Sequence, residues 1–560
     1  MGIFINLDIS KSVTKKEWED VYNETLVLIK NFPLAEKKSI SIHGVDTLCL
    51  VQTEEHCFYS SWGPSYEKMG WEAVGDMETL NVAEDYFLPR DLIGDREIEK
   101  ESGDAMLGAF PAYLNYKWDD PRFKHTYGMW GNKTQGEPYH IYLLAVACLI
   151  EARLGTKAFT YGDITRGQCK KAVEIANEYL ENKIDVPDRC CADRLLKRIS
   201  ALEFTEKDKI SIFDAFYLGT KDASFGEILK VHFSKDSLSY YWENRFKNSP
   251  FGTIGFNREI SEYLLWGFEI DELCEYVIFK DKDGKEHYEE FVKRIMDAKL
   301  HLKDKNCADP LIINQEEERP YGIGTLFAQF EFAGARNKKV DRYIPIEEIR
   351  MALKRGLCGK IDVDLLIDEY LKAEAEQIEI NLKENIVTRE QLEQAVEQDA
   401  SEAFGQIMDI KRKVIAESYK KYDINDLEDL MGYTTGDKIH PKIEKALGKL
   451  RGFLDEILSE PKYAELNRES SSEKYRWITE YNRYILLRKR DWEQVYEKLE
   501  DSTEFFARYY SLMRINSEHN HVNIMVSALM INDELYQYTA KLAESVSGHK
   551  GDSRRRGIYD

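Results

Sequence analysis

The chain has 560 residues, of which 43% are hydrophobic and 12% aromatic, and its formal net charge is −23. This length predicts about three domains instead of one core, and the hydrophobic share excludes a chain that is disordered throughout. An acidic surface repels phosphate groups over a long range, which argues against nucleic acid and anionic membranes as partners.

Residues 1–100 are predicted to form a small α/β unit of the type β-α-β-β. Isoleucine or leucine occupies every second position over residues 3–9, which is the period of a strand. Thr14 and Glu17 have the spacing of a capping box, in which two side chains bond the free amide groups at the start of a helix. Two further strands are expected within residues 40–51.

The next region, residues 101–305, is predicted to be a helical domain with an aromatic loop at residues 110–138. Pro138 suits the first turn of a helix, and Gly155 suits its end. The segment between them is apolar on every face, so we expect it in the middle of a core. Residues 58–92, which precede this domain, show no clear period, and we assign no element there.

More helices are predicted downstream in the same region. Thr165 and Gln168 have the spacing of a second capping box, and the apolar stripe after them indicates a helix with one buried face. Helical patterns also cover residues 188–202, 222–234, 256–268 and 286–301. For residues 276–279 a short hairpin is an alternative to a helix.

Residues 320–546 are predicted to form a domain of long amphipathic helices, after a boundary loop at residues 303–321. One helix is expected to begin at Pro441. Another, after Thr388, is about 33 residues and roughly 50 Å long at 1.5 Å per residue. Such helices provide surfaces and spacing more often than a chemical pocket. The basic tail, residues 547–560, is expected to be mobile.

The cysteine pattern and the first residues indicate the compartment. Nine cysteines are irregularly spaced and none forms a Cys-x-x-Cys pair, which is typical of reduced thiols in a cytosolic protein. The chain begins without the basic stretch and cleavage site of a secretory signal, and its longest apolar run, residues 141–150, is too short to span a bilayer. We therefore expect a soluble cytoplasmic protein that does not bind membranes.

Arg514 and His519 form the sharpest catalytic hint. An arginine followed after a few residues by a histidine, in a helical setting, resembles the signature of HEPN-type ribonucleases. The resemblance covers only residues 514–519. It implies metal-independent RNA cleavage, in which Arg514 stabilises phosphate charge and His519 moves a proton for attack by the 2′-hydroxyl. Ile515 departs from the pattern, which prefers a polar residue there, and the plainer interpretation is that both side chains face solvent or cap a helix.

A second candidate site is an aromatic and polar block in the loop at residues 110–138 and just after it. Aromatic faces beside charged side chains suit recognition of a sugar, a nucleobase or a peptide. The residues predicted to bind a ligand are Trp118, Asp119, Asp120, Arg122, His125, Trp130, Glu137 and His140. An enzyme pocket for a carbohydrate or nucleotide is a further hypothesis, and it requires Asp119, His125 and His140 to converge. The plainer interpretation is a surface loop held by its aromatic residues on the buried helix.

Metal and cofactor signals are weak. His43, Cys49, His56 and Cys57 are potential zinc ligands, but their spacing matches no standard finger and a pair of strands explains them without a metal. The chain contains no P-loop, no dinucleotide-binding fingerprint and no set of kinase motifs. We therefore predict no metal and no cofactor.

These observations favour a cytosolic, mostly helical, multidomain protein with a small α/β N-terminal unit. The favoured function is non-catalytic binding: an adaptor or structural component of an assembly, which recognises a protein partner or a small ligand. Long acidic helices offer extensive contact surface, and no catalytic constellation stands out from the sequence. The ribonuclease that uses Arg514 and His519 is the alternative, and only this alternative has RNA as a partner.

Overall fold

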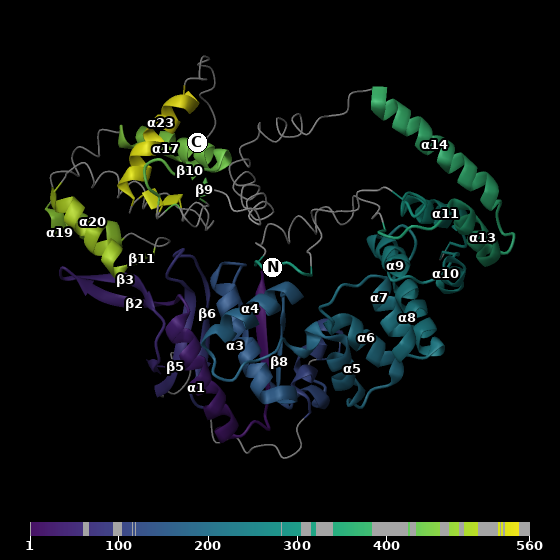
Figure 1. The fold of residues 1–560 in the computed structure, drawn as a ribbon, viewed down its shortest axis with the longest axis horizontal. Helices are drawn as coiled ribbons and strands as arrows, with labels where there is room; N and C mark the ends of the chain where they lie inside the picture. Colours follow the sequence, from purple (N-terminus) through teal and green to yellow (C-terminus); the bar gives the residue numbers. More distant parts are fainter. Residues whose placement is uncertain are drawn as a thin grey trace.

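The computed structural model is a mostly helical protein with a smaller share of strand, as the sequence predicts. It describes residues 2–59, 67–92, 103–114, 116–117, 119–281, 283–303, 315–320, 340–383, 424–425, 430, 433–459, 470–480, 486–501, 525–526, 528–529 and 532–547. Figure 1 shows the sheets at the centre and left, a run of helices to the right, and the last helices back beside the N-terminal strands. Within these ranges, no helix combines the length and the apolar composition that crossing a membrane requires.

The first strand lies in the middle of a three-stranded sheet. Strand β1 (Phe4–Ser10) pairs antiparallel with β7 (Thr126–Lys133) on one side and with β8 (Ala158–Gly162) on the other. Ile5 and Leu7 are fully buried, as the alternation over residues 3–9 predicts. The sheet therefore joins segments that lie more than a hundred residues apart in the chain.

The predicted elements of the N-terminal unit occur in order, but they do not form one sheet. Helix α1 (Lys15–Asn31) begins with the predicted capping box, in which the Thr14 N–H donates to Glu17 Oε2 at 2.8 Å. Strands β2 (Leu34–Ile42) and β3 (Val45–Gln52) follow and pair with each other. The predicted order β-α-β-β is therefore present, but β2 and β3 belong to a second sheet that β1 does not join, because β1 pairs with strands much later in the chain.

The second sheet includes strands within residues 58–92, the segment in which the sequence shows no clear period. Its order is β11 (Leu487–Arg488), β3, β2, β5 (Glu67–Asp76) and β4 (His56–Tyr59), and β6 (Val82–Pro89) also pairs with β5. The β2–β3 hairpin turns at His43 and Gly44, whose φ angles are 47° and 79°. Two successive residues with positive φ match the right-handed twist of a tight hairpin.

Two helices form the centre of the core beside these sheets. Helix α3 (Tyr139–Leu154) is buried along nearly its whole length, as its apolar sequence predicts. Helix α4 (Arg166–Tyr179) begins with the predicted Thr165–Gln168 capping box, in which the Gln168 N–H donates to Thr165 Oγ1 at 3.0 Å. One apolar cluster joins α1, α3, α4 and both sheets.

The right-hand part of Figure 1 is helical. Its helices are α5 (Ala192–Ser200), α6 (Glu206–Phe216), α7 (Ala223–His232), α8 (Lys235–Asn248), α9 (Ile254–Leu265), α10 (Ile270–Tyr276), α11 (Tyr288–Asp297), α13 (Ile346–Leu357) and α14 (Val363–Lys383). The short helix α2 (Phe110–Tyr113) packs with them through Phe110. A second apolar cluster runs from Ala105 to Ile367 and joins these helices. A bridge between Lys280 and Glu286 closes a small hairpin after α10, close to the predicted one.

The C-terminal helices share an apolar cluster with the second sheet. They are α17 (Pro441–Leu458), α19 (Ser471–Glu480), α20 (Lys489–Asp501) and α23 (Asp533–Ser547), and a short parallel pair, β9 (Ile424–Asn425) and β10 (Lys438–Ile439), precedes them. Helix α17 begins at Pro441 as predicted, whereas the long helix expected after Thr388 lies outside the described residues. Thr47 Oγ1 lies 2.9 Å from Tyr475 Oη, and the His43 ring stacks on Tyr496 at 4.0 Å.

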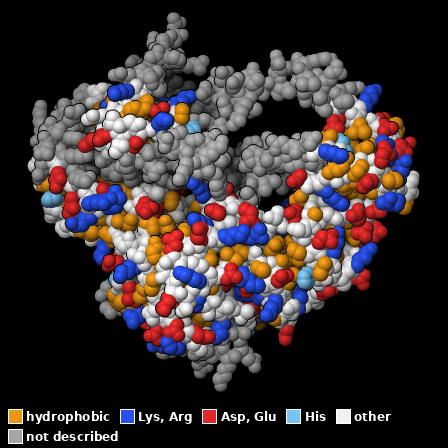
Figure 2. Space-filling model, in the orientation of Figure 1, with side chains coloured by type: hydrophobic (Ala, Val, Ile, Leu, Met, Phe, Trp, Pro, Cys, Tyr) orange, Lys and Arg blue, Asp and Glu red, His pale blue; other side chains and the backbone are white. Residues whose placement is uncertain are grey.

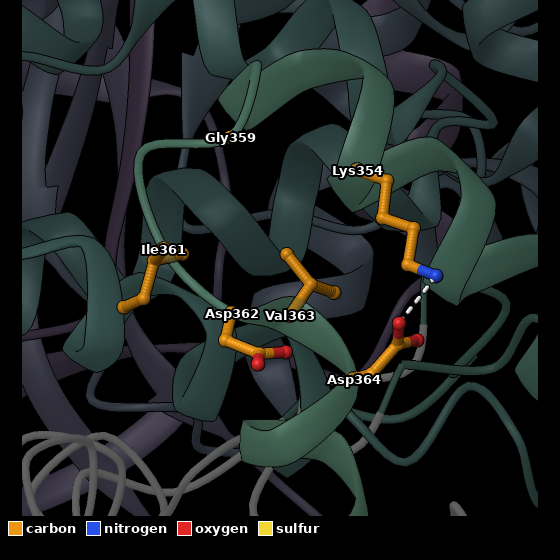
Figure 3. Close-up of a pocket in the computed structure, with 6 residues that line it drawn as sticks. All are labelled: Lys354, Gly359, Ile361, Asp362, Val363 and Asp364. Atoms are coloured by element: carbon orange, nitrogen blue, oxygen red, sulfur yellow. Dashed lines mark ion pairs between the residues drawn. The ribbon is translucent and has the colours of Figure 1, made fainter.

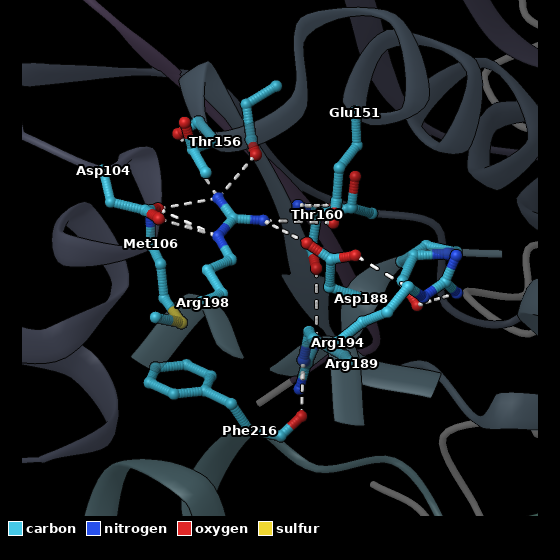
Figure 4. Close-up of polar contacts among 12 residues, drawn as sticks. Asp104, Met106, Glu151, Thr156, Thr160, Asp188, Arg189, Arg194, Arg198 and Phe216 are labelled. Atoms are coloured by element: carbon cyan, nitrogen blue, oxygen red, sulfur yellow. Dashed lines mark hydrogen bonds and ion pairs between the residues drawn. The ribbon is translucent and has the colours of Figure 1, made fainter. Parts of the chain in front are cut away.

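A buried cluster of charged side chains links α5 with three earlier segments of the chain (Figure 4). The side chain of Arg198 on α5 is 2% exposed. Its Nη2 donates to Asp104 Oδ1 at 2.7 Å, and its Nη1 lies 3.5 Å from Glu151 and 3.4 Å from Asp188. Burial raises the pKa of Glu151. Because these groups are occupied with one another inside the fold, we interpret the cluster as structural.

Candidate binding site between strands β6 and β7

A cavity of about 330 Å³ lies between strands β6 and β7, where the two sheets meet. Its lining combines aromatic rings with a few polar groups. The lining residues are Asp85, Phe87 and Pro89 from β6, and Tyr127, Gly128, Met129, Trp130 and Asn132 from β7. Ligand sites usually have this composition, and their volumes begin near roughly 300 Å³. We refer to this space as the β6–β7 cavity.

Side chains of β7 hold the two strand edges together, since β6 and β7 do not pair as strands. The indole N–H of Trp130 donates to the carbonyl oxygen of Phe87 at 2.9 Å. The side-chain amide of Asn132 donates to the carbonyl oxygen of Asp85. Because side chains and not backbone groups of β7 bond these β6 carbonyl oxygens, the two edges are linked without forming a ladder, and the cavity lies between them.

A β-bulge in β7 brings its aromatic residues to the same cavity. The register between β1 and β7 shifts so that Asp8 faces Gly128 while Leu7 faces Trp130, and Met129 has no partner. In a regular strand Tyr127 and Trp130 would point to opposite faces, because side chains alternate. The extra residue reverses that alternation and lets both line the cavity.

Two of the aromatic walls are fixed by their neighbours. The ring of Phe87 lies against Gly70, where any Cβ would meet it at 2.8 Å, and it packs edge-on to Phe58 with ring centroids 4.9 Å apart. Trp130 packs edge-on to Tyr86 at 5.4 Å. Because these rings are held by packing, a ligand that enters the cavity orders few side chains and binding costs less conformational entropy.

Carboxyl groups accumulate on the outer face of the sheet beside the cavity. Burial, followed by the charge of Asp85, raises the pKa of Glu72 on the neighbouring strand. Burial also raises the pKa of Glu36 to about 7, and His56 Nδ1 lies 3.4 Å from its Oε2. The cavity therefore opens beside a surface that favours positive charge.

The structure places one predicted residue, Trp130, in this cavity. Asp119 is exposed and Asp120 is half-buried, and both lie in the turn before a short 3-10 helix at Pro121–Phe123. Trp118 and the side chain of Arg122 lie outside the described residues. Among its described residues, the part of the predicted loop that precedes β7 therefore contributes nothing to the lining.

The predicted histidines do not come together. His125 precedes β7 and His140 lies at the start of α3, and the intervening strand of this length spans about 25 Å. His140 is fully buried, its Nδ1 lies 2.6 Å from Thr134 Oγ1, and burial lowers its pKa to about 3. Glu137 is also buried, and its N–H donates to the carbonyl of Thr134 in the turn between β7 and α3. We find no convergence of Asp119, His125 and His140 of the kind that the enzyme-pocket hypothesis requires.

Arg514 and His519 lie outside the described residues, so the ribonuclease interpretation stays a prediction. The potential zinc ligands have other surroundings: Cys49 is buried in β3, and His43 stacks on Tyr496. Over the part of the chain that the structure describes, no group of three or more histidine, cysteine or acidic side chains is arranged to hold a metal.

Asp85 and Phe87 were not predicted. They lie in β6, within the region that shows no clear period from sequence. The available signal was the segment Val82–Pro89, in which Tyr86 and Leu88 point to the core while Asp85 and Phe87 point away. This short alternation, which ends at a proline, indicates an edge strand.

A second hollow of about 500 Å³ lies at the turn between α13 and α14 (Figure 3). Lys354 and Asp364 form an ion pair of 2.5 Å across it. Asp362 accepts the backbone N–H of Leu365 at 3.1 Å and thereby caps α14. Its polar groups serve the local fold and its lining contains no aromatic ring, so we place the candidate site in the β6–β7 cavity instead.

The chain matches no protein-family model, no curated protein and no solved structure.

Proposed function

We propose that this is a non-catalytic binding protein of the cytoplasm, and that the β6–β7 cavity recognises a protein partner or small ligand. The observation that carries the proposal is a cavity with fixed aromatic walls and a carboxylate at its mouth. The polar side chains of the lining, those of Asp85, Tyr127 and Asn132, suit hydrogen bonding and charge recognition. The lining offers no paired nucleophile and base.

The surface supports a ligand other than nucleic acid. On the face shown in Figure 2, acidic and basic side chains of the described residues are interspersed, and they form no extended basic groove. The described cysteines are all free thiols, which agrees with a reducing compartment.

Filling the cavity tests the proposal. Gly128 is exposed at the cavity, and a Cβ built there meets only Asp8 Oδ1, at an ordinary 3.5 Å. The added side chain starts on the Asp8 side of β7, but Gly128 itself lines the cavity, so we expect Gly128→Leu to keep the fold and to narrow the cavity at this edge. The matched control is Gly452→Leu on α17, where an added Cβ has no neighbour within 4 Å.

The measurement is ligand-observed NMR with arginine amide, lysine amide, methyl glucoside and adenosine as probes. We expect at least one probe to bind the wild type and the Gly452→Leu control but not Gly128→Leu. If no probe depends on position 128 for binding, the cavity is not a recognition site and the proposal fails.

A further inference from the structure

We infer that the β6–β7 cavity binds a guanidinium group, presented as the arginine side chain of a partner protein. The inference rests on the proposed function and adds the chemical class of the ligand. It is carried by the charge at the cavity mouth, the shape of the walls and the small number of polar groups in the lining.

The negative charge at the mouth of the β6–β7 cavity favours a cationic ligand. Asp85 is exposed at the edge of the cavity, and Glu72 lies beside it on the adjacent strand. The charge of Asp85 acts on Glu72 more strongly than the opposing positive charges of His56 and Lys37. Two neighbouring carboxylates repel each other, and a bound cation relieves that repulsion.

The walls favour a flat cation. Phe87 and Tyr127 present half-buried rings, and Trp130, which is 5% exposed, closes the inner wall. A guanidinium group is planar, is weakly hydrated and stacks on aromatic faces, and its parallel N–H groups match a carboxylate such as that of Asp85. An ammonium group is compact and strongly hydrated, so it loses more on entering an apolar space.

The lining is poorly suited to a neutral polar ligand. A sugar presents many hydroxyl groups that need partners, and the lining has three polar side chains, one of which, Asn132, already donates to the β6 backbone. A neutral nucleobase would gain no charge attraction from the carboxylates. The volume of about 330 Å³ lies at the small end of ligand sites, which favours one side chain over a nucleotide.

The path into the cavity is also suited to a side chain. Gly128 and Asp85 are both exposed, and they lie on opposite strands of the cavity edge. Gly128 lines the cavity without adding a side chain to it, so we expect an extended arginine to enter with its charged end toward Asp85 while its peptide backbone stays outside.

The test uses the full-length protein and fluorescein-labelled tripeptides measured by fluorescence anisotropy. The peptides are Gly-Arg-Gly, Gly-citrulline-Gly and Gly-Lys-Gly. Citrulline keeps the shape of arginine and removes its charge. We expect the arginine peptide to bind at least about tenfold more tightly than the citrulline peptide, since a charge-assisted bond is lost. We expect Asp85→Asn to reduce arginine binding by a similar factor, while the exposed control Asp46→Asn leaves it unchanged.

The outcomes separate the two proposals. Equal binding of the arginine and citrulline peptides, or arginine binding that Asp85→Asn does not weaken, overturns the guanidinium inference. If another probe still binds in a manner that depends on Gly128, the cavity remains a recognition site with a different ligand. If no ligand depends on Gly128, both proposals fail. Competition by free arginine indicates that a small guanidino compound suffices, and its absence identifies a peptide as the ligand.

Discussion

Asp8 is a buried acid in the middle of the central strand. It is 4% exposed, and burial raises its pKa from 3.8 to about 7, although the Tyr161 hydroxyl donates to it at 3.3 Å. Gly108 lies so close that an added Cβ would be 2.2 Å from Asp8 Oδ2. The surroundings therefore accommodate a neutral side chain better than a charged one.

This environment predicts a pH dependence of stability. Because folding raises the pKa of Asp8, its contribution is complete below the unfolded value of 3.8 and is lost as the pH rises through about 7. We expect Asp8→Asn to remove this loss, so that the variant is more stable than the wild type at about pH 8 by up to a few kcal/mol. Urea unfolding followed by circular dichroism at about pH 5 and about pH 8 measures the difference. An identical pH dependence in both proteins would contradict the assignment.

At the scale of elements, Arg198 on α5 holds three carboxylates at the junction of two apolar clusters (Figure 4). Removing one partner of a buried charge cluster leaves the others uncompensated. We expect Arg198→Met to lower the free energy of unfolding by about 3–5 kcal/mol. The neighbouring Arg194 is 34% exposed, and we expect Arg194→Met to cost no more than about 1 kcal/mol. Similar small losses in both variants, measured by urea unfolding, would show that the cluster is not structural.

A short acidic segment packs on the first turn of α4. The Gly167 N–H donates to the carbonyl oxygen of Gln315 at 2.9 Å, and Arg166 and Lys170 both form ion pairs with Glu316. A Cβ on Gly167 would lie 2.3 Å from the Glu316 carbonyl oxygen. The contact therefore depends on the absence of a side chain at this position.

Gly167→Ala is expected to displace residues 315–320 from α4. We predict faster cleavage of the native protein after Glu316–Glu318 by a glutamate-specific protease, because proteolysis requires an accessible extended segment. Gly452→Ala, at a position with open space, is the control. Unchanged cleavage in Gly167→Ala would mean that the segment adapts without leaving the helix.

Elements with local signals could be predicted, and their pairing could not. The capping boxes at Thr14 and Thr165 and the helix start at Pro441 depend on residues a few positions apart. The pairing of β1 with β7 and β8, and of β11 with β3, depends on residues far apart in the chain. The candidate site shows the same limit. The sequence predicts Trp130 as a ligand-binding residue because it is aromatic. Its hydrogen bond to Phe87 depends on two strand edges and a bulge, which no local pattern predicts.

For the whole molecule, the β2–β3 hairpin and the last described helices share one core. Sheet residues such as Ile42 and Leu50 belong to the same apolar cluster as Leu454 and Leu529. The C-terminal helices therefore share a core with the sheet that carries β6, and this cluster extends from the β2–β3 hairpin to Val82 at the start of β6.

The net charge of −23 favours a cationic partner, as the carboxylate at the cavity does. An acidic molecule attracts a cationic partner over distances longer than direct contact, and salt screens this attraction. Binding of an arginine-bearing partner should therefore be faster at low ionic strength, whereas a neutral ligand would show little salt dependence.

The most direct test of the account is a crystal structure of the protein with the Gly-Arg-Gly peptide. We predict that the guanidinium lies within the β6–β7 cavity, stacked on Phe87 or Trp130 and hydrogen-bonded to the carboxylate of Asp85. A bound peptide elsewhere on the molecule, with this cavity filled only by water, would contradict the account.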